Sequence, residues 1–233
     1  MKQDLISFIF ARGGSKGIKN KNIVDLDGKP LIAHSILHAK KSKRISTVVV
    51  STDDQKIAEI SESYGAQILE RPQYLALDDS PEIEAWQHAI KSYKKYFDKD
   101  LPFISLPTTS PLRDINKLDS ALDLYLSNKF DLVLGVSKSS RNPYLNMAKV
   151  SLENKNEIQM IMKEDFFRRQ DVPEVFDITT NFYIGNANYI LCSESVTQGK
   201  IGFIEVTRQE AIDIDDNFDL HLTKLLFRDS YEQ

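Results

Sequence analysis

Short apolar runs alternate with amphipathic helical patterns along most of this chain, and that rhythm limits the folds open to it. The runs are continuously apolar and rich in Ile, Val and Phe, and they predict strands at 5–10, 47–51, 66–69, 103–106 and 131–136. Helical patterns lie between them, at 30–41, 54–64, 81–96 and 115–126. Strands that are apolar on both faces are typical of a parallel sheet that helices cover on both sides. We therefore expect an α/β fold with a mostly parallel, doubly wound sheet.

Length and composition indicate one domain with an insertion. With 233 residues and 41% hydrophobic content, the chain can bury one sizeable core, and we treat 1–233 as a single domain. From 137 to 181 the rhythm breaks into polar residues and short alternating runs, which predicts an inserted segment. The pattern resumes with expected strands at 181–184 and 203–206 and a closing helix at 216–227.

Charge and cysteine content argue against several classes of protein. A net charge of −4 and a pI near 5.6 do not favour a nucleic-acid binder. The single cysteine, Cys192, excludes an internal disulfide and a cysteine-based zinc site, and it fits a reducing compartment. The run at 5–10 is too short to cross a bilayer and lacks the features of a signal peptide. We expect a cytoplasmic protein without nucleic-acid or membrane partners.

A cationic, glycine-rich stretch follows the first expected strand. Residues 10–22 read Phe-Ala-Arg-Gly-Gly-Ser-Lys-Gly-Ile-Lys-Asn-Lys-Asn. The glycines allow a tight turn that brings backbone N–H groups close to an anion, and the basic side chains add positive charge before the first acid, Asp25. The stretch matches neither the dinucleotide pattern G-x-G-x-x-G nor the P-loop pattern G-x-x-x-x-G-K-S/T. It predicts a phosphate-binding loop of another kind, with an ordinary polar turn as the alternative.

Other polar motifs are expected near this loop. Ser51-Thr52-Asp53 closes the second strand, and residues 107–113 follow a later one. Ligands of parallel sheets bind at the carboxyl ends of the strands, so these motifs should converge. In the segment Ile-Asp-Ile-Asp, the spacing of Asp213 and Asp215 puts both carboxylates on one face of an extended chain. The pair suits Mg²⁺, with capping of the next helix as the alternative.

In their order along the chain, these motifs resemble those of the acylneuraminate cytidylyltransferases, the CMP-sialic acid synthetases and their relatives for other nine-carbon acidic sugars. The matching segments span most of the chain and are 11–22, 51–53, 110–113, 212–215 and 218–220. The resemblance implies a Rossmann-like nucleotidyltransferase fold and the transfer of CMP from CTP to the anomeric hydroxyl of the sugar acid. It also implies Mg²⁺ and a homodimer, in which a segment like 137–181 clasps the second subunit and brings residues to its active site.

The resemblance assigns roles to individual residues. Catalysis is expected from Arg12, Lys21, Asp213 and Asp215, with the two aspartates as metal ligands. The nucleotide is expected to contact Arg12, Gly13, Gly14, Ser15, Lys16, Lys21, Asn22, Arg71 and Ser80. The sugar acid is expected to contact Arg113, Arg169, Gln170 and Tyr183. An ion pair with a neighbouring acid is the alternative for Arg71, and an ordinary half-buried strand position is the alternative for Tyr183.

The identity of the sugar stays open at this stage. Many sialic-type members carry glutamine six positions before the arginine of the Ser-Pro-Leu-Arg motif, where this chain has Pro107. The stretch 141–144, Arg-Asn-Pro-Tyr, resembles members that activate bacterial acids such as legionaminic acid. A sugar-phosphate nucleotidyltransferase of the same fold and a catalytically silent nucleotide-binding regulatory protein are the alternatives. The aspartate pair argues against the first, and the intact loop argues against the second.

Overall fold

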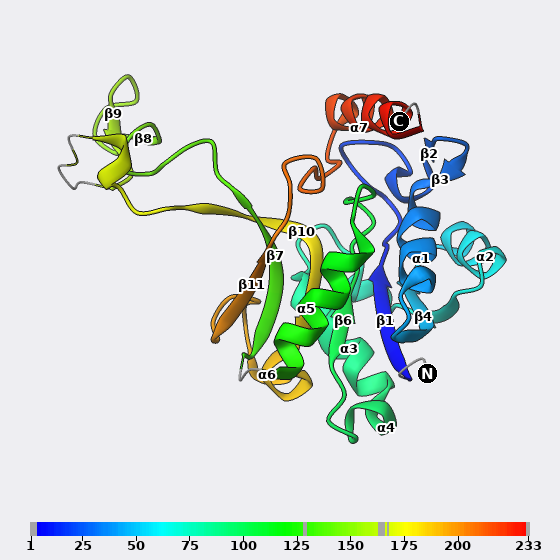
Figure 1. The fold of residues 1–233 in the computed structure, drawn as a ribbon. Coiled ribbons are helices and arrows are strands. Elements are labelled where there is room, and N and C mark those ends of the chain that lie inside the picture. Colours follow the sequence, from blue (N-terminus) through cyan, green and yellow to red (C-terminus); the bar gives the residue numbers. More distant parts are fainter. Residues whose placement is uncertain (1–3, 128–129, 163–165, 167, 232–233) are drawn as a thin grey trace.

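The computed structural model describes residues 4–127, 130–162, 166 and 168–231, and a seven-stranded sheet forms its centre (Figure 1). The strands, in their order across the sheet, are β11 (Ile201–Glu205), β7 (Leu132–Lys138), β10 (Phe176–Gly185), β6 (Phe103–Ser105), β1 (Leu5–Phe10), β4 (Ile45–Thr52) and β5 (Gln67–Glu70). Strand β10 pairs antiparallel with both neighbours, and the other pairings are parallel. The predicted mostly parallel α/β sheet is confirmed.

Helices cover both faces of this sheet. One face packs against α1 (Leu31–Lys41), α2 (Gln55–Ser63) and α5 (Ile115–Ser127), which bury Ile36, Ile57 and Leu118. The other face packs against α3 (Glu82–Ser92), α4 (Lys94–Phe97) and α6 (Ala187–Cys192), with Trp86 fully buried. Since the central strands are buried on both sides, their sequences are apolar without alternation, which explains the pattern that predicted them.

Two predicted elements have different bounds in the structure. The helix expected at 81–96 is two helices, because the chain leaves helical geometry at Tyr93, with φ of −107° and ψ of 33°. Strand β10 starts at Phe176, where it pairs with Lys138, inside the expected insertion. Its first half carries polar and exposed residues, so the sequence did not signal a strand there.

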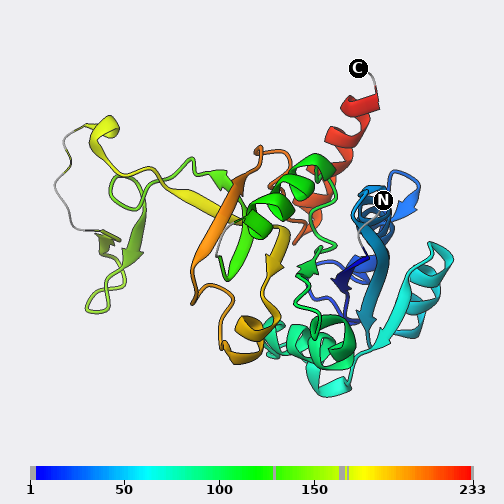
Figure 2. The same ribbon diagram turned by 60° about the horizontal axis from the view of Figure 1, so that its bottom comes forward.

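The described residues between 139 and 175 project from the body as an extension, which is visible on the left in Figures 1 and 2. Its regular elements are the antiparallel pair β8 (Ala148–Val150) and β9 (Ile158–Met160) and the short helix η3 (Arg169–Asp171). The chain then returns to the sheet through β10. The extension therefore contributes little to the central core.

A small second layer covers one end of the sheet. It consists of the turn η1 (Lys21–Ile23), the hairpin of β2 (Asp25–Leu26) and β3 (Lys29–Pro30), and the last helix, α7 (Asn217–Tyr231). A further turn, η2 (Gln73–Leu75), follows β5. Within the described part of the chain, no helix combines the length and apolar character that crossing a membrane requires.

The strand order reverses next to β1. From β1 the chain continues to β4 and β5 on one side, and it then returns to β6 on the other side. The loops that leave β1 and β6 therefore diverge and open a crevice at their carboxyl ends, which is where open α/β sheets bind ligands.

Candidate active site

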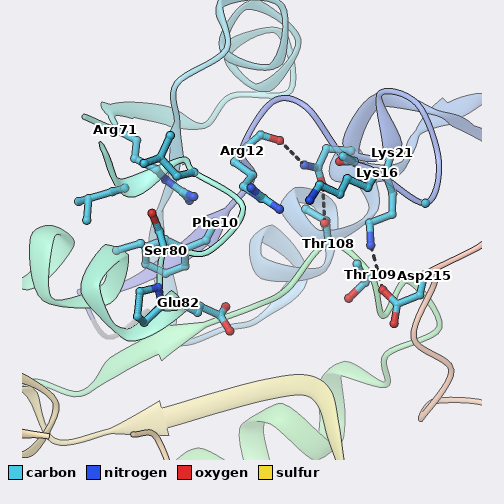
Figure 3. Close-up of a pocket in the computed structure, with 17 residues that line it drawn as sticks. Phe10, Arg12, Lys16, Lys21, Arg71, Ser80, Glu82, Thr108, Thr109 and Asp215 are labelled. Carbon is cyan, nitrogen blue, oxygen red and sulfur yellow. Dashed lines mark hydrogen bonds and ion pairs between the residues drawn. The ribbon is translucent and has the colours of Figure 1, made fainter. Parts of the chain in front are cut away.

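A cavity of about 320 Å³ lies at this reversal point, lined from the ends of β1, β5 and β6 (Figure 3). The predicted nucleotide and metal residues that line it are Arg12, Ser15, Lys16, Lys21, Asn22, Arg71, Ser80 and Asp215. The structure thus brings these residues, which lie far apart in the sequence, to one pocket.

The two predicted loop glycines shape the loop from behind the pocket. The N–H of Gly13 donates to the Asp53 carboxylate at 2.9 Å. Gly14 has a φ of +71°, in the left-handed region that glycine adopts without strain. Both line a narrow adjoining hollow and not the large pocket. The geometry therefore favours a role of these glycines in forming the turn of the loop. It does not favour the predicted contact with the nucleotide.

Asn22 braces the loop against the segment that follows β6. Its side-chain nitrogen donates to the Arg12 carbonyl at 2.9 Å, and its side-chain oxygen accepts from the Thr108 hydroxyl at 2.7 Å. Because both ends of the buried amide are used within the protein, Asn22 is better suited to positioning Arg12 than to contacting the nucleotide itself.

The basic side chains of the loop that line the pocket each have a carboxylate partner. Arg12 and Lys16 lie 2.8 Å and 2.6 Å from the two oxygens of Asp78. Lys21 lies 3.1 Å from an oxygen of Asp215. Hydrogen bonds from Lys16 and then from Arg12 hold the pKa of Asp78 below its usual value. These pairs are partly exposed to solvent, so an anion that enters the pocket can replace the carboxylates at modest cost.

Arg71 is buried in the wall of the pocket. Its Nε donates to the Ser51 hydroxyl at 3.2 Å and an Nη donates to the Ser51 carbonyl at 2.9 Å, while the guanidinium lies 5.6 Å from the Phe10 ring centroid. Burial lowers the pKa of Arg71 to about 10. Among the described residues no carboxylate lies at ion-pair distance, so the ion-pair alternative is not supported. The Ser80 hydroxyl, on the same wall, donates to the Tyr74 carbonyl at 2.7 Å.

The two predicted metal ligands have different surroundings. Asp215 is exposed and lines the pocket, whereas Asp213 is half-buried and does not line it. Burial raises the pKa of Asp213, and the charge of Asp215 acts in the same direction. Its Oδ1 is buried without a hydrogen-bond partner among the described residues. A buried carboxylate oxygen without a donor is suited to binding a cation.

The side chains of Asp213 and Asp215 do not cap helix α7. Asp216 caps α7 by accepting from the N–H groups of Phe218 at 2.8 Å and Asp219 at 3.1 Å. Asp219 in turn accepts from the N–H groups of Asp215 and Asp216. The capping alternative is therefore not supported for Asp213 and Asp215. Asp215 pairs instead with Lys21, and hydrogen bonds from the Thr109 and Thr180 hydroxyls act against the rise in the pKa of Asp213.

A close backbone contact joins the loop to the acidic segment. A Cβ atom on Gly17 would lie 2.2 Å from the Asp215 carbonyl oxygen, so only glycine fits there. Next to it, Ile18 belongs to the same buried cluster as Ile214 and Leu220. This packing sets the distance between the basic loop and the acids.

Arg113, which was predicted to contact the sugar, does not line the large pocket. It is buried, and it donates to the main-chain carbonyls of Asn181 and Pro107, the latter at 2.9 Å. Burial lowers its pKa to about 9. An Nη also donates to the Ser35 hydroxyl at 3.5 Å. Arg113 therefore ties the segment after β6 to strand β10 and helix α1.

The other predicted sugar contacts are divided between two places. Gln170 is exposed on η3 in the extension, which projects away from strands β1 and β6 in Figures 1 and 2. The backbone of Arg169 lies in the same turn, and its side chain is outside the described part of the structure. Tyr183 lies on β10 beneath the pocket, with its ring 5.1 Å from that of Trp86. In this chain alone the predicted set does not form one site.

Two acids, one beside the pocket and one lining it, were not predicted as site residues from the sequence. Asp78 pairs with the loop cations, and Glu82 projects into the pocket from the start of α3. Both lie next to Ser80, which was predicted, but acids before and within the first turn of a helix are commonly explained by the helix dipole. The sequence held no signal that distinguished them.

Comparison with known proteins identifies the family of this chain. A sequence model of the family described as cytidylyltransferase matches residues 6–228. Post-translational flagellin modification protein B of Campylobacter coli is 30% identical over 97% of this chain and 96% of that protein. The CMP-N,N'-diacetyllegionaminic acid synthase of Campylobacter jejuni is 29% identical over 96% of this chain and 94% of its own length. The N-acylneuraminate cytidylyltransferase of Escherichia coli is 30% identical over 95% of this chain, but only 52% of its own length is covered.

Solved structures show the same fold at low sequence identity. A CMP:2-keto-3-deoxy-manno-octonic acid synthetase complexed with CTP superposes with a TM-score of 0.74 at 15% identity, over 98% of this chain and all of that one. The 4-diphosphocytidyl-2C-methyl-D-erythritol synthase of Anaerococcus prevotii gives a TM-score of 0.65 at 14% identity, over 97% and 96% of the two chains. By the extent of the family match and by these relatives, the chain is a nucleotidyltransferase that belongs to the cytidylyltransferase family.

Proposed function

We propose that this enzyme transfers CMP from CTP to the anomeric hydroxyl of a nonulosonic acid and releases pyrophosphate. The observation that carries the proposal is the composition of the pocket: Arg12, Lys16 and Lys21 line one side, and Asp215 faces Lys21 (Figure 3). Cations suit a triphosphate, and a carboxylate beside them suits a divalent metal bound to the same phosphates. The names of the relatives supply the acceptor class, a legionaminic, pseudaminic or N-acylneuraminic acid.

The reaction is a displacement at the α-phosphorus of CTP. The anomeric hydroxyl gives up its proton to water, its oxygen forms a bond to the α-phosphorus, the bond to the bridging oxygen breaks, and pyrophosphate leaves with that electron pair. Arg12, Lys16 and Lys21 would neutralise the charge on the phosphates and on the leaving group. Binding the triphosphate would exchange Asp78 for phosphate oxygens on Arg12 and Lys16. Arg71 and Ser80 would border the nucleoside end of the pocket.

The acidic segment fits Mg²⁺. Asp213 has a buried oxygen without a donor, and Asp215 opens onto the pocket. No cluster of three or more acidic, histidine or cysteine ligands exists among the described residues, so phosphate oxygens and water would complete the coordination. Mg²⁺ is commonly held in this way, by one or two carboxylates together with substrate phosphates. When bound, it would supply charge neutralisation at the reacting phosphate.

The extension is proposed to hold a second copy of the chain. Its two-stranded sheet exposes Val150 and Ile158, and the connection between the two strands exposes Leu152. A hairpin of this kind is only marginally stable in isolation. Exposed apolar surface that is not part of a core usually marks an interface. A homodimer built through residues 137–181 would cover these side chains and would carry Arg169 and Gln170 toward the partner's pocket. We also propose that residues 1–233 form a single domain with this insertion and that the enzyme acts in the cytoplasm.

Pyrophosphate release tests the proposed reaction. Purified protein with Mg²⁺ and CTP is given N-acetylneuraminic, legionaminic, pseudaminic and Kdo-type acids in turn, with UTP and hexose 1-phosphates as controls. We expect a strong signal with CTP and one nine-carbon acid, and loss of that signal when EDTA removes the metal. Release with UTP and a hexose 1-phosphate would favour the sugar-phosphate alternative. Silence with every acid, despite CTP binding, would contradict the proposal. Light scattering during gel filtration tests the dimer.

A further inference from the structure

An acidic side chain faces the pocket from the wall opposite the cationic loop. Glu82 lies in the first turn of α3, and in Figure 3 its carboxylate points into the cavity, away from Arg71 and toward the side of Thr109 and Asp215. It is accessible from the pocket, and among the described residues it forms no ion pair. Glu84, in the same turn, does not line the cavity. The helix dipole accounts for an acid at this end of the helix, but it does not account for one that faces the ligand space.

The groups around Glu82 are polar and only partly satisfied. The indole nitrogen of Trp86 is buried without a partner at full hydrogen-bond geometry, although it is near enough to the Glu82 carboxyl to lower its pKa. Removal from bulk solvent outweighs this effect and raises the pKa of Glu82. The charges of Glu82 and Asp213 both raise the pKa of Tyr183, after burial. Glu82 therefore lies between the nucleoside end of the pocket and the acidic segment.

Charge determines which substrate part can lie against this wall. The phosphates of CTP would be repelled by Glu82 and attracted by Arg12, Lys16 and Lys21, so they belong on the loop side. The carboxylate of the sugar acid would be repelled as well. What remains favourable beside Glu82 is a group that donates hydrogen bonds. The cytosine amine and ribose hydroxyls of CTP are of this kind, and so are the hydroxyl and amide N–H groups of the acceptor. The acceptor is favoured because the Glu82 carboxylate points away from Arg71 and toward the side of Thr109 and Asp215 (Figure 3).

We propose that Glu82 is a specificity-determining residue for the acceptor, because its carboxylate accepts a hydrogen bond from a hydroxyl or amide N–H of the sugar acid. The inference rests on the proposed function. It assigns to the sugar the side of the pocket that carries Glu82 at the start of α3, which we call the α3 wall. It also orients the sugar, since the acid group of the substrate must turn away from Glu82. A site built to accept a hydrogen bond discriminates against an analogue that lacks the donor, because the ligand then covers the carboxylate without pairing with it.

Steady-state kinetics of Glu82→Gln, with Glu84→Gln as the matched control, test this inference. Both changes remove one negative charge from the same helical turn. For Glu82→Gln we expect kcat/KM for the acceptor to fall roughly tenfold or more, as expected for a lost charge-assisted contact. The KM for CTP, and the Kd for CTP measured by calorimetry without acceptor, should stay within about twofold. Glu84→Gln should match the wild type, and thermal unfolding should show that both variants are folded.

Other outcomes distinguish a failure of this inference from a failure of the proposed function on which it rests. Wild-type protein that is silent with every acid would remove the proposed function and this inference with it. Active wild type with unchanged acceptor kinetics in Glu82→Gln would overturn the inference alone. A rise in the KM and Kd of CTP would also overturn it, by assigning Glu82 to the cytosine amine. An equal effect of Glu84→Gln would indicate a general effect of helix charge. For an acceptor analogue that lacks the donor group, kcat/KM should be the same with Glu82→Gln as with the wild type. A lower kcat/KM with the variant would contradict the proposed contact.

Discussion

The two walls of the pocket differ in how their charges are balanced. One wall is formed by the cationic, glycine-rich loop, and we call it the loop wall. On this wall, Arg12 and Lys16 are paired with Asp78, and Lys21 is paired with Asp215. On the α3 wall, Glu82 has no ion pair among the described residues. Binding on the first wall is therefore an exchange, in which phosphate replaces a carboxylate of the protein. Binding on the second wall creates contacts that the protein does not make alone.

This difference indicates where affinity and selectivity arise. An exchange of one anion for another gains little net energy from each exposed pair, so the loop wall owes its effect to geometry fixed in advance. A polar group without a partner contributes more binding free energy when a ligand donates a hydrogen bond to it. It costs more binding free energy when a ligand covers it without doing so. The loop wall should thus govern the rate, and the α3 wall should govern which acceptor is used.

Asp215→Ala should have the largest effect. It removes a proposed metal ligand and leaves Lys21 without its partner, and we expect turnover to fall by roughly three orders of magnitude, since charge stabilisation by a metal contributes several kcal/mol. Initial rates at saturating CTP and Mg²⁺ measure it. Asp216→Ala is the control, because it removes the same charge but affects the α7 cap, with an expected cost of about 1 kcal/mol in unfolding free energy. Near-normal turnover of Asp215→Ala would refute the metal assignment.

Arg12→Ala should follow, with a loss of roughly 100-fold in kcat/KM for CTP, which is typical for removal of one donor to developing charge. The kinetics should be compared with those of Arg12→Lys, which keeps the charge but not the planar fork. If Arg12→Ala stays within a few-fold of the wild type, the phosphate role of the loop is wrong.

Gly17→Ala tests whether the spacing of loop and acids matters. The added Cβ cannot lie 2.2 Å from the Asp215 carbonyl oxygen, so the loop and the acidic segment must separate. We expect kcat to fall roughly tenfold, because small misplacements of reacting groups are costly. Thermal unfolding should shift only modestly. Unchanged kcat would mean that the contact is incidental and that the loop wall is less rigid than proposed.

Asp78→Asn should have the smallest effect and the opposite sign. Without the carboxylate, CTP no longer displaces an anion from Arg12 and Lys16, and its Kd should fall by about two- to fivefold, in line with the small effect of exposed pairs. Asp79→Asn, next in sequence, removes an equal charge as the control. Weaker CTP binding in Asp78→Asn would show that Asp78 orients the two cations and does not compete with the nucleotide.

The sequence predicted the fold and the loop wall better than the α3 wall. Continuous apolar strands and a run of glycine and lysine are local signals, and the local rule for parallel sheets brings their ends together. Glu82 was not predicted, because its position depends on the angle at which α3 leaves Pro81. Arg113 was assigned to the sugar, and the structure buries it against carbonyls of Pro107 and Asn181. Packing between distant segments decides such cases, and a motif does not encode it.

The contact between Gly17 and Asp215 also bears on how the enzyme is made. The ribosome releases the loop long before it releases the acidic segment. Until then the nascent chain has a basic loop without the acids beside it, and it lacks Ile214 and Leu220, which bury Ile18. Catalysis should therefore begin only after the acidic segment has been released. A chain that is cut before residue 212 should retain the strands of the sheet and yet consume no nucleotide.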